Sequence, residues 1–274
     1  MVDLDQPVGA DQLPPSETGY FIKAEGHRGA GPGEAAPGFA FAPDAPGALD
    51  NLSAMAKDWR QALVQASCTG IQVGVSVLID KGKPLAISCV RDCHPLPHSK
   101  GTMSLRESCW IPDIAADTVR RLAHLGWQGC AMGEYRYDTQ TGTFNLIEIN
   151  FRFWQYLHLD LWAGVDYPRM QAEWFLDGRT TFSTTPRLGV ICRDTWPGEV
   201  AQLVNELRRE DLSWGGKAAS AWRFLARFCD PRIHQDFWFP GDRLLYWRNL
   251  AGFLSDEFRS LIGRGPIQRA GSDP

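Results

Sequence analysis

Three oxygen-bearing side chains, Glu134, Glu148 and Asn150, occur in two neighbouring stretches, residues 129–137 and 143–150, that read as the strands of one hairpin. Because successive side chains of a strand point to opposite faces, Glu148 and Asn150 share a face. Pairing of the two strands brings Glu134 across from the second half of its partner. Two carboxylates and an amide are the hard oxygen ligands that Mg²⁺ binds when it also keeps phosphate oxygens and water. The pattern therefore predicts a magnesium site on one face of a sheet.

An alternative interpretation treats these three residues as ordinary exposed side chains of a half-buried sheet, and any one of them alone fits it. Glu148 and Asn150, however, lie inside the apolar sequence LIEINFRFW of residues 146–154. Acidic side chains within such an apolar strand are unusual unless they bind something. We therefore favour the metal site, and the exposed-surface alternative stays open.

Three arginines are candidates for binding anionic groups. Arg152 follows Asn150 by two residues, and a guanidinium beside a metal-bound triphosphate would neutralise charge and hold the transferred phosphoryl group. Arg91 and Arg106 flank an irregular loop, residues 92–104, and planar bidentate arginines suit substrate carboxylates and phosphates. The alternative for each arginine is a surface side chain that is solvated or paired with an acid.

Lys23 ends a short predicted strand and precedes a segment rich in glycine, alanine and proline, residues 26–47. Backbone N–H groups of such a loop can close over phosphates. The segment matches neither the P-loop pattern nor the dinucleotide fingerprint, and an isolated lysine is more often simply solvated. His94 and His98 suggest a zinc or Cys–His site only weakly, because prolines extend their loop and no third ligand is near in sequence.

The elements expected to position these residues mix strands and helices. The sequence predicts one hairpin over residues 74–80 and 83–91, with its turn at Asp80-Lys81-Gly82, and a second over 129–137 and 143–150. A helix capped by Asp50 is predicted to run to about Ala62. Further helices are predicted to begin at Asp113 and to span residues 168–176, 197–208 and 218–228.

Composition limits the class of protein. A net charge of -4 argues against a broad nucleic-acid partner. No apolar run approaches the ~20 residues that span a bilayer, and the N-terminus lacks the features of a secretion signal. The seven cysteines form no C-x-x-C pair, which predicts reduced thiols rather than a disulfide framework. We expect a cytoplasmic protein that binds small molecules, without a membrane or nucleic-acid partner.

With these residues in view, the stretch from 129 to 168 resembles the closing half of an ATP-grasp domain. It is most similar to the carbamoyl-phosphate-synthase-like ATP-grasp proteins. In that family a strand pair bears an acidic residue or glutamine, then glutamate-x-asparagine-x-arginine, and these positions match Glu134, Glu148, Asn150 and Arg152 here. The resemblance implies that the four residues bind magnesium and the terminal phosphates of ATP.

The resemblance also covers the N-terminal part of the chain. The sequence GYFIKAE resembles the strand whose lysine, Lys23 here, contacts the nucleotide phosphates. Val64, Gln65 and Ala66 match the hinge strand along which adenine lies. Family members usually carry an acid after the glutamine to hold the adenine amine or the ribose, and Ala66 cannot do so.

The resemblance implies an α+β fold of the ATP-grasp type, with two lobes, the nucleotide between them and the first lobe incomplete. We expect a flexible N-terminus (1–18), a partial first lobe with the hinge (19–66), a second lobe with the Mg·ATP site (67–178) and a helical C-terminal extension (179–274). Such enzymes normally begin with a further α/β domain. The chain is therefore expected to be a fragment, or to take the missing N-terminal domain from a partner chain.

The function implied is an ATP-dependent carboxylate–amine ligase that acts through an acyl phosphate. Its cofactors would be ATP and Mg²⁺, with Mn²⁺ as an alternative ion, and its substrates a small-molecule carboxylate and a nucleophile. The competing hypothesis is a truncated or degenerate ATP-grasp module that binds nucleotide or a partner without catalysis. The short N-terminus and Ala66 favour this second hypothesis, whereas the intact trio and Arg152 oppose it.

Overall fold

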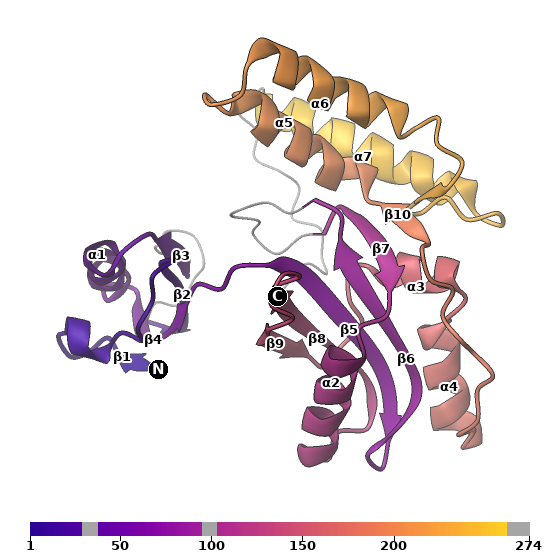
Figure 1. The fold of residues 1–274 in the computed structure, drawn as a ribbon, viewed down its shortest axis with the longest axis horizontal. Helices are drawn as coiled ribbons and strands as arrows, with labels where there is room; N and C mark the ends of the chain where they lie inside the picture. The colour runs from indigo at the N-terminus through magenta and orange to yellow at the C-terminus, as the bar shows by residue number, and fades with distance from the viewer. Residues whose placement is uncertain (29–37, 95–102, 262–274) are drawn as a thin grey trace. The chain divides into compact units, whose positions relative to one another are not determined.

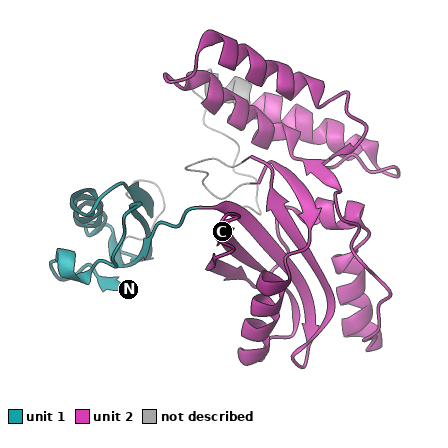
Figure 2. Ribbon diagram, in the orientation of Figure 1, with its two compact units in different colours: residues 1–69 teal, residues 70–274 magenta. Residues whose placement is uncertain are grey.

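The computed structural model describes residues 1–28, 38–94 and 103–261, which form two compact units, residues 1–69 and 70–274 (Figure 2). Each unit combines a β-sheet with helices, so the predicted α+β class is confirmed. Part of the glycine-rich segment (29–37) and His98 lie outside the described residues. The predicted division of the chain at residue 178 stays a prediction.

Unit 1 is a four-stranded antiparallel sheet with one α-helix packed on it (Figure 1). The core includes Ile22, Leu52 and Ala62, all fully buried or nearly so. The strand order is β1-β4-β2-β3. The elements are β1 (Val2–Asp3), a 3-10 turn (Ala10–Gln12), β2 (Tyr20–His27), β3 (Phe39–Ala42), α1 (Ala45–Met55) and β4 (Trp59–Ala66).

The helix of unit 1 corrects one prediction, since the helix predicted from Asp50 to about Ala62 is wrong at both ends. Helix α1 begins at Ala45, where the Asp44 carboxylate accepts a hydrogen bond of 2.8 Å from the Gly47 amide and Pro46 stands in the first turn. The helix ends at Met55, and β4 begins at Trp59 after a short turn. Pairing with β2 outweighs local helix propensity there, because it satisfies the backbone of the whole segment.

Unit 2 is built on a seven-stranded sheet of order β11-β10-β7-β6-β5-β8-β9. Both predicted hairpins are confirmed, β5 with β6 and β8 with β9, whereas β7, β10 and β11 were not predicted. All neighbouring strands are antiparallel except β10 and β11. The strands are β5 (Ile71–Asp80), β6 (Lys83–Asp92), β7 (Leu105–Cys109), β8 (Gly129–Tyr137), β9 (Phe144–Asn150), β10 (Ile191–Arg193) and β11 (Ile233–Gln235).

The central strand β5 separates two different faces of this sheet. Its odd-numbered residues, Val73 to Ile79, pack with helix α2 (Pro112–His124) in a mainly apolar cluster. Its even-numbered residues face helices α3 (Leu157–Ala163) and α4 (Tyr167–Asp177) and include Gln72, Gly74 and Ser76. Polar groups are thus concentrated on one face, which we call the polar face.

The last part of unit 2 contains helices α5 (Val200–Arg208), α6 (Trp214–Ala226) and α7 (Arg243–Leu261), which lie together in Figure 1. The helices predicted over 197–208 and 218–228 are confirmed with shifted bounds, whereas α3 and α7 were not predicted. Strands β10 and β11 join this region to the sheet through β7. Among the described helices, none is both long and apolar enough to cross a bilayer.

A carboxyl group lies buried between the polar face and α3. Asp160 accepts hydrogen bonds from Ser88 Oγ at 2.6 Å and Trp154 Nε1 at 2.7 Å, with Ser76 Oγ at 3.4 Å. Burial raises the pKa of Asp160 to about 7, against the opposing effect of these donors. The protein therefore holds this carboxyl in a state that takes up a proton near neutral pH.

We predict that Asp160 makes stability fall as pH rises. The folded carboxyl binds a proton more readily than the unfolded one, so its contribution is complete below about pH 4 and is lost through about pH 7. Asp160→Asn should flatten the dependence of the free energy of unfolding on pH. The wild type should lose roughly 1–3 kcal/mol more than this variant between about pH 4 and pH 7. Urea unfolding at several pH values measures it. The exposed control Asp11→Asn should keep the wild-type slope, and an unchanged slope in Asp160→Asn would contradict the assignment.

Candidate functional site

The predicted metal ligands meet on the polar face of the β8–β9 hairpin. Glu134 is paired directly with Glu148, and Met132 is paired with Asn150. Directly opposite residues of an antiparallel pair project to the same side, with Cβ atoms about 5 Å apart. The Asn150 Nδ2 donates to Glu148 Oε1 at 2.9 Å. The three side chains therefore share one patch, as the alternation of the sequence predicts.

A register shift sets this pairing. Tyr135 is paired with Leu146, although Glu134 is paired with Glu148, so one residue of β9 is extra at this point. Such a bulge bends a strand and re-aims its side chains. Without the shift, Glu134 would stand opposite Ile147, and the side chain of Glu148 would project to the other face. The bulge is thus what places the two carboxylates on one side of the sheet.

The direct pairing of Glu134 with Glu148 places two acidic side chains across from each other, and like charges in this position are destabilising. A divalent cation held by the two carboxylates and the Asn150 amide would reduce that repulsion, and the donor set is one that suits Mg²⁺. Among the described residues, no group of three His, Cys, Asp or Glu side chains could hold a metal ion. The candidate site therefore depends on the amide as its third ligand.

Three polar residues that the sequence analysis did not name lie on the same face. Gln72 Nε2 donates to Glu134 Oε2 at 3.3 Å, and Gln72 is paired with Arg136 across β5 and β8. Asp92, at the end of β6, is buried, and burial raises its pKa to about 6 although Arg136 opposes the shift. Arg136 follows Glu134 by two residues, so the rule of alternation could have identified it.

Tyr156 reaches this face from the segment before α3. Its hydroxyl lies so close to Gly74 that a Cβ added there would come within 1.9 Å of it. Gly74 is the residue paired with Glu134 across β5 and β8, so a glycine makes room for the phenol beside the carboxylate. The buried hydroxyl has no hydrogen-bond partner among the described residues.

The structure does not bring Arg91 to the carboxylates. Arg91 is paired with Val73, which points to the α2 side of the sheet, whereas Glu134 points to the polar face. Its guanidinium instead pairs with Glu107 at 2.7 Å. Arg152 lies two residues past the end of β9, is exposed, and donates to the Phe153 carbonyl at 3.1 Å.

Arg106 lies on the polar face, opposite Asp92, but its side chain has no exposed surface. The guanidinium pairs with Asp236 and donates to the Met103 carbonyl at 2.8 Å. Asp236 in turn accepts from the Cys192 thiol at 2.8 Å. This arrangement joins β7 to the segment after β11 and gives Arg106 a structural role, so Arg91 and Arg106 are not retained as catalytic candidates.

The predicted nucleotide-contacting residues of unit 1 lie on neighbouring strands. Lys23 in β2 is paired with Leu63 in β4, and the next three pairs along the ladder join Ile22, Phe21 and Tyr20 to Val64, Gln65 and Ala66. The lysine and the hinge segment are therefore brought together within unit 1. Their contact with nucleotide stays a prediction.

No protein-family model matches the chain, and no curated protein matches it. The solved structures that are similar to part of it include an L-amino acid ligase from Bacillus licheniformis, 12% identical with a TM-score of 0.44. That match covers 60% of this chain and 40% of the ligase.

Two biotin carboxylases are similar at the same level, each 16% identical and each covering 63% of this chain and 40% of the other. One is the biotin carboxylase domain of the Hydrogenobacter thermophilus 2-oxoglutarate carboxylase, crystallised with MgADP, ADP and bicarbonate, with a TM-score of 0.45. The other is biotin carboxylase from Campylobacter jejuni in complex with β-γ-ATP, with a TM-score of 0.44. These are proteins of the ATP-grasp type that the sequence resembles. At these identities and TM-scores the similarities assign no activity, so function is inferred from the side chains.

We predict that Asp236→Ala destabilises the protein by about 3–5 kcal/mol, because it leaves the buried Arg106 charge without its partner. Urea unfolding followed by circular dichroism measures the loss. The matched control is Asp230→Asn, which removes the exposed pair with Arg232 and should change stability little. An Asp236→Ala protein as stable as the wild type would show that Arg106 has no structural role.

Proposed function

We propose that this chain supplies the Mg·ATP-binding part of an ATP-grasp ligase that joins a carboxylate to an amine. The observation that carries the proposal is the direct pairing of Glu134 with Glu148 on one sheet face, with Asn150 hydrogen-bonded to Glu148. Such a group of oxygen ligands has a clear use if a divalent cation and phosphates bind there. The ATP-grasp resemblance of the E-x-N-x-R hairpin supports the same function.

Each residue of the site has a proposed role. Glu134, Glu148 and Asn150 hold Mg²⁺, or Mn²⁺ in its place, and the ion when bound neutralises phosphate charge. Arg152 neutralises the terminal phosphate from the end of β9. Lys23 contacts the phosphates, and Val64, Gln65 and Ala66 line the adenine.

The proposed chemistry has two balanced steps. A carboxylate oxygen of the substrate attacks the γ-phosphorus of ATP, the bond to the β–γ bridging oxygen breaks, and ADP leaves. An amine then attacks the carbonyl carbon of the acyl phosphate, inorganic phosphate leaves, and the nitrogen loses a proton. No covalent protein nucleophile is needed, so catalysis depends on positioning and charge neutralisation.

A second candidate function is a module that binds nucleotide or a partner chain without catalysis. Ala66 favours it, because a methyl group cannot accept the hydrogen bonds that an acid at this position makes to adenine or ribose. The chain covers 40% of the length of the ligase and of both carboxylases. The substrate pocket is therefore expected to need further domains, in the same protein or in a partner.

We predict that Glu148→Gln weakens Mg²⁺-dependent ATP binding by at least about tenfold, since it removes a charged ligand and leaves the shape of the strand unchanged. Isothermal titration calorimetry with and without EDTA measures the effect. Asn145→Ala, an exposed position on the same strand β9, is the matched control and should bind as the wild type does. Unchanged Mg·ATP affinity in a folded Glu148→Gln protein would refute the metal site.

We also predict that turnover releases ADP and inorganic phosphate, not AMP and pyrophosphate. A panel of small carboxylates is screened with hydroxylamine, which traps an acyl phosphate as a hydroxamate. With an ¹⁸O-labelled carboxylate, one labelled oxygen should appear in the released phosphate, and Glu148→Gln should abolish both signals. AMP as product would contradict γ-phosphoryl transfer. Mg·ATP binding without ADP release for any carboxylate would support the non-catalytic module.

A further inference from the structure

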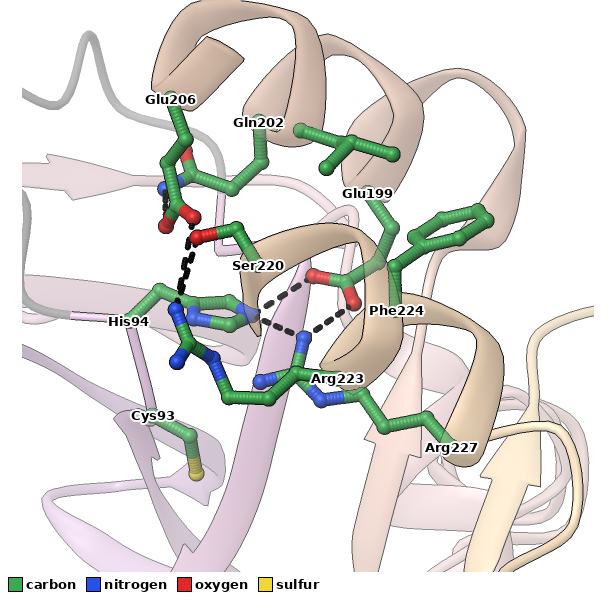
Figure 3. A pocket seen from close by; sticks show the side chains of 10 residues that line it. Cys93, His94, Glu199, Gln202, Glu206, Ser220, Arg223, Phe224 and Arg227 are labelled. Atoms are coloured by element: carbon green, nitrogen blue, oxygen red, sulfur yellow. Dashed lines mark hydrogen bonds and ion pairs between the residues drawn. The ribbon is translucent and has the colours of Figure 1, made fainter. Parts of the chain in front are cut away.

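A second polar site lies in unit 2, between helices α5 and α6 and the end of β6. It is a cavity of about 260 Å³, the volume of roughly nine water molecules at ~30 Å³ each. Figure 3 shows side chains from both helices converging on it. The lining residues are spaced three and four apart, so each helix with its cap residue presents one face. They are Glu199, Gln202, Leu203 and Glu206 from α5 and its N-cap, Ser220, Arg223, Phe224 and Arg227 from α6 and its C-cap, and Cys93 and His94 directly after β6.

Glu199 is the buried centre of this site, with 1% of its side chain exposed. One oxygen accepts from His94 Nε2 at 2.7 Å and Ser104 Oγ at 3.0 Å. The other pairs with Arg227 at 2.7 Å and with the buried Arg193 at 3.4 Å. Burial alone would raise the pKa of Glu199, but His94, Arg227 and Arg193 outweigh it and lower the pKa to about 2. This carboxylate is ionised, and both of its oxygens are satisfied.

Glu206 is also supplied with donors. One of its oxygens accepts from Gln202 Nε2 at 3.2 Å, and the other lies 3.7 Å from Arg223 Nη2. A bound cation would have to compete with these donors for either glutamate. The acidic side chains of the cavity are therefore poor sites for a cationic ligand.

The two arginines of the lining, Arg223 and Arg227, in contrast have N–H donors that the described part of the protein does not use. A guanidinium offers five N–H groups in a planar fork. Arg227 directs Nη1 to Glu199 at 2.7 Å, and Arg223 directs Nη2 to Ser220 at 2.8 Å. Among the described residues, no partner accepts from the Nε and the other Nη of either arginine. Planar, bidentate donors of this kind suit a carboxylate.

We propose that this cavity binds a small organic monocarboxylate, held by the unused donors of Arg223 and Arg227. Leu203 and Phe224 are the two large apolar side chains among the lining residues, which are otherwise mostly polar, so the ligand that the cavity suits is a small carboxylate with a short chain. The buried Arg193, whose guanidinium lies 5.0 Å from the Phe224 ring, adds positive charge behind the site. The site is separate from the Glu134–Glu148 patch and does not depend on ATP or magnesium.

The test uses the full chain without nucleotide or metal, with butyrate as the probe. Saturation-transfer NMR and calorimetry should detect saturable binding at millimolar concentrations or below, and no binding of butylamine. Arg223→Gln should weaken butyrate at least about tenfold. Arg223 is more than half exposed, so this variant should fold. Arg227→Gln should have a similar effect, and Arg208→Gln, exposed on α5 and outside the lining, should have none.

Three results would overturn the proposal. They are no saturable butyrate binding up to about 10 mM, equal binding by the folded Arg223→Gln and wild-type proteins, and tighter binding of inorganic phosphate than of butyrate. Glu148→Gln should leave butyrate binding unchanged. The proposed carboxylate site and the proposed metal site can therefore be tested independently of each other.

Discussion

Two carboxylates that face each other across neighbouring strands are the constraint on which the proposed site depends. Glu134 and Glu148 cannot move apart without breaking the β8–β9 ladder, and the ladder is anchored by β5 through nine paired positions. Their mutual repulsion is thus held in place by the folding of the whole sheet. A cation bound as we propose would convert this repulsion into attraction, so the pairing of the strands itself would favour metal binding.

The polar face around this pair belongs to a strand, β5, whose other face packs in the hydrophobic core. The side chains of β5 on its α2 side are apolar, whereas those on the opposite side include Gln72, Gly74 and Ser76. Helix α3 covers that side only in part, and brings Asp160 and the preceding Tyr156 to it. Strand β5 is buried on both faces, and its two faces differ: one carries residues that pack, and the other carries residues that form hydrogen bonds.

The features that could be predicted from the sequence are those that depend on residues close together in the chain. The two hairpins and the shared face of Glu148 and Asn150 follow from alternation and turn residues, which involve few neighbours, whereas the alignment of Glu134 with Glu148 needs the bulge in β9. The structural role of Arg106 could not be predicted, because its partner Asp236 lies 130 residues away in the chain. Strands β10 and β11, of three residues each, carry too little alternation to identify, since their pairing is with distant strands.

The end of β6 connects the two polar sites of unit 2. Asp92 lies on the polar face, where its charge interacts with Arg136. It also accepts a hydrogen bond of 2.8 Å from the His94 amide, and the His94 ring donates to Glu199 in the α5–α6 cavity. Only two residues separate these contacts, so the backbone there cannot shift at one site without moving a hydrogen bond at the other. Asp92, buried and with its pKa raised to about 6 by that burial, therefore lies between Arg136 of the polar face and the residues that line the cavity.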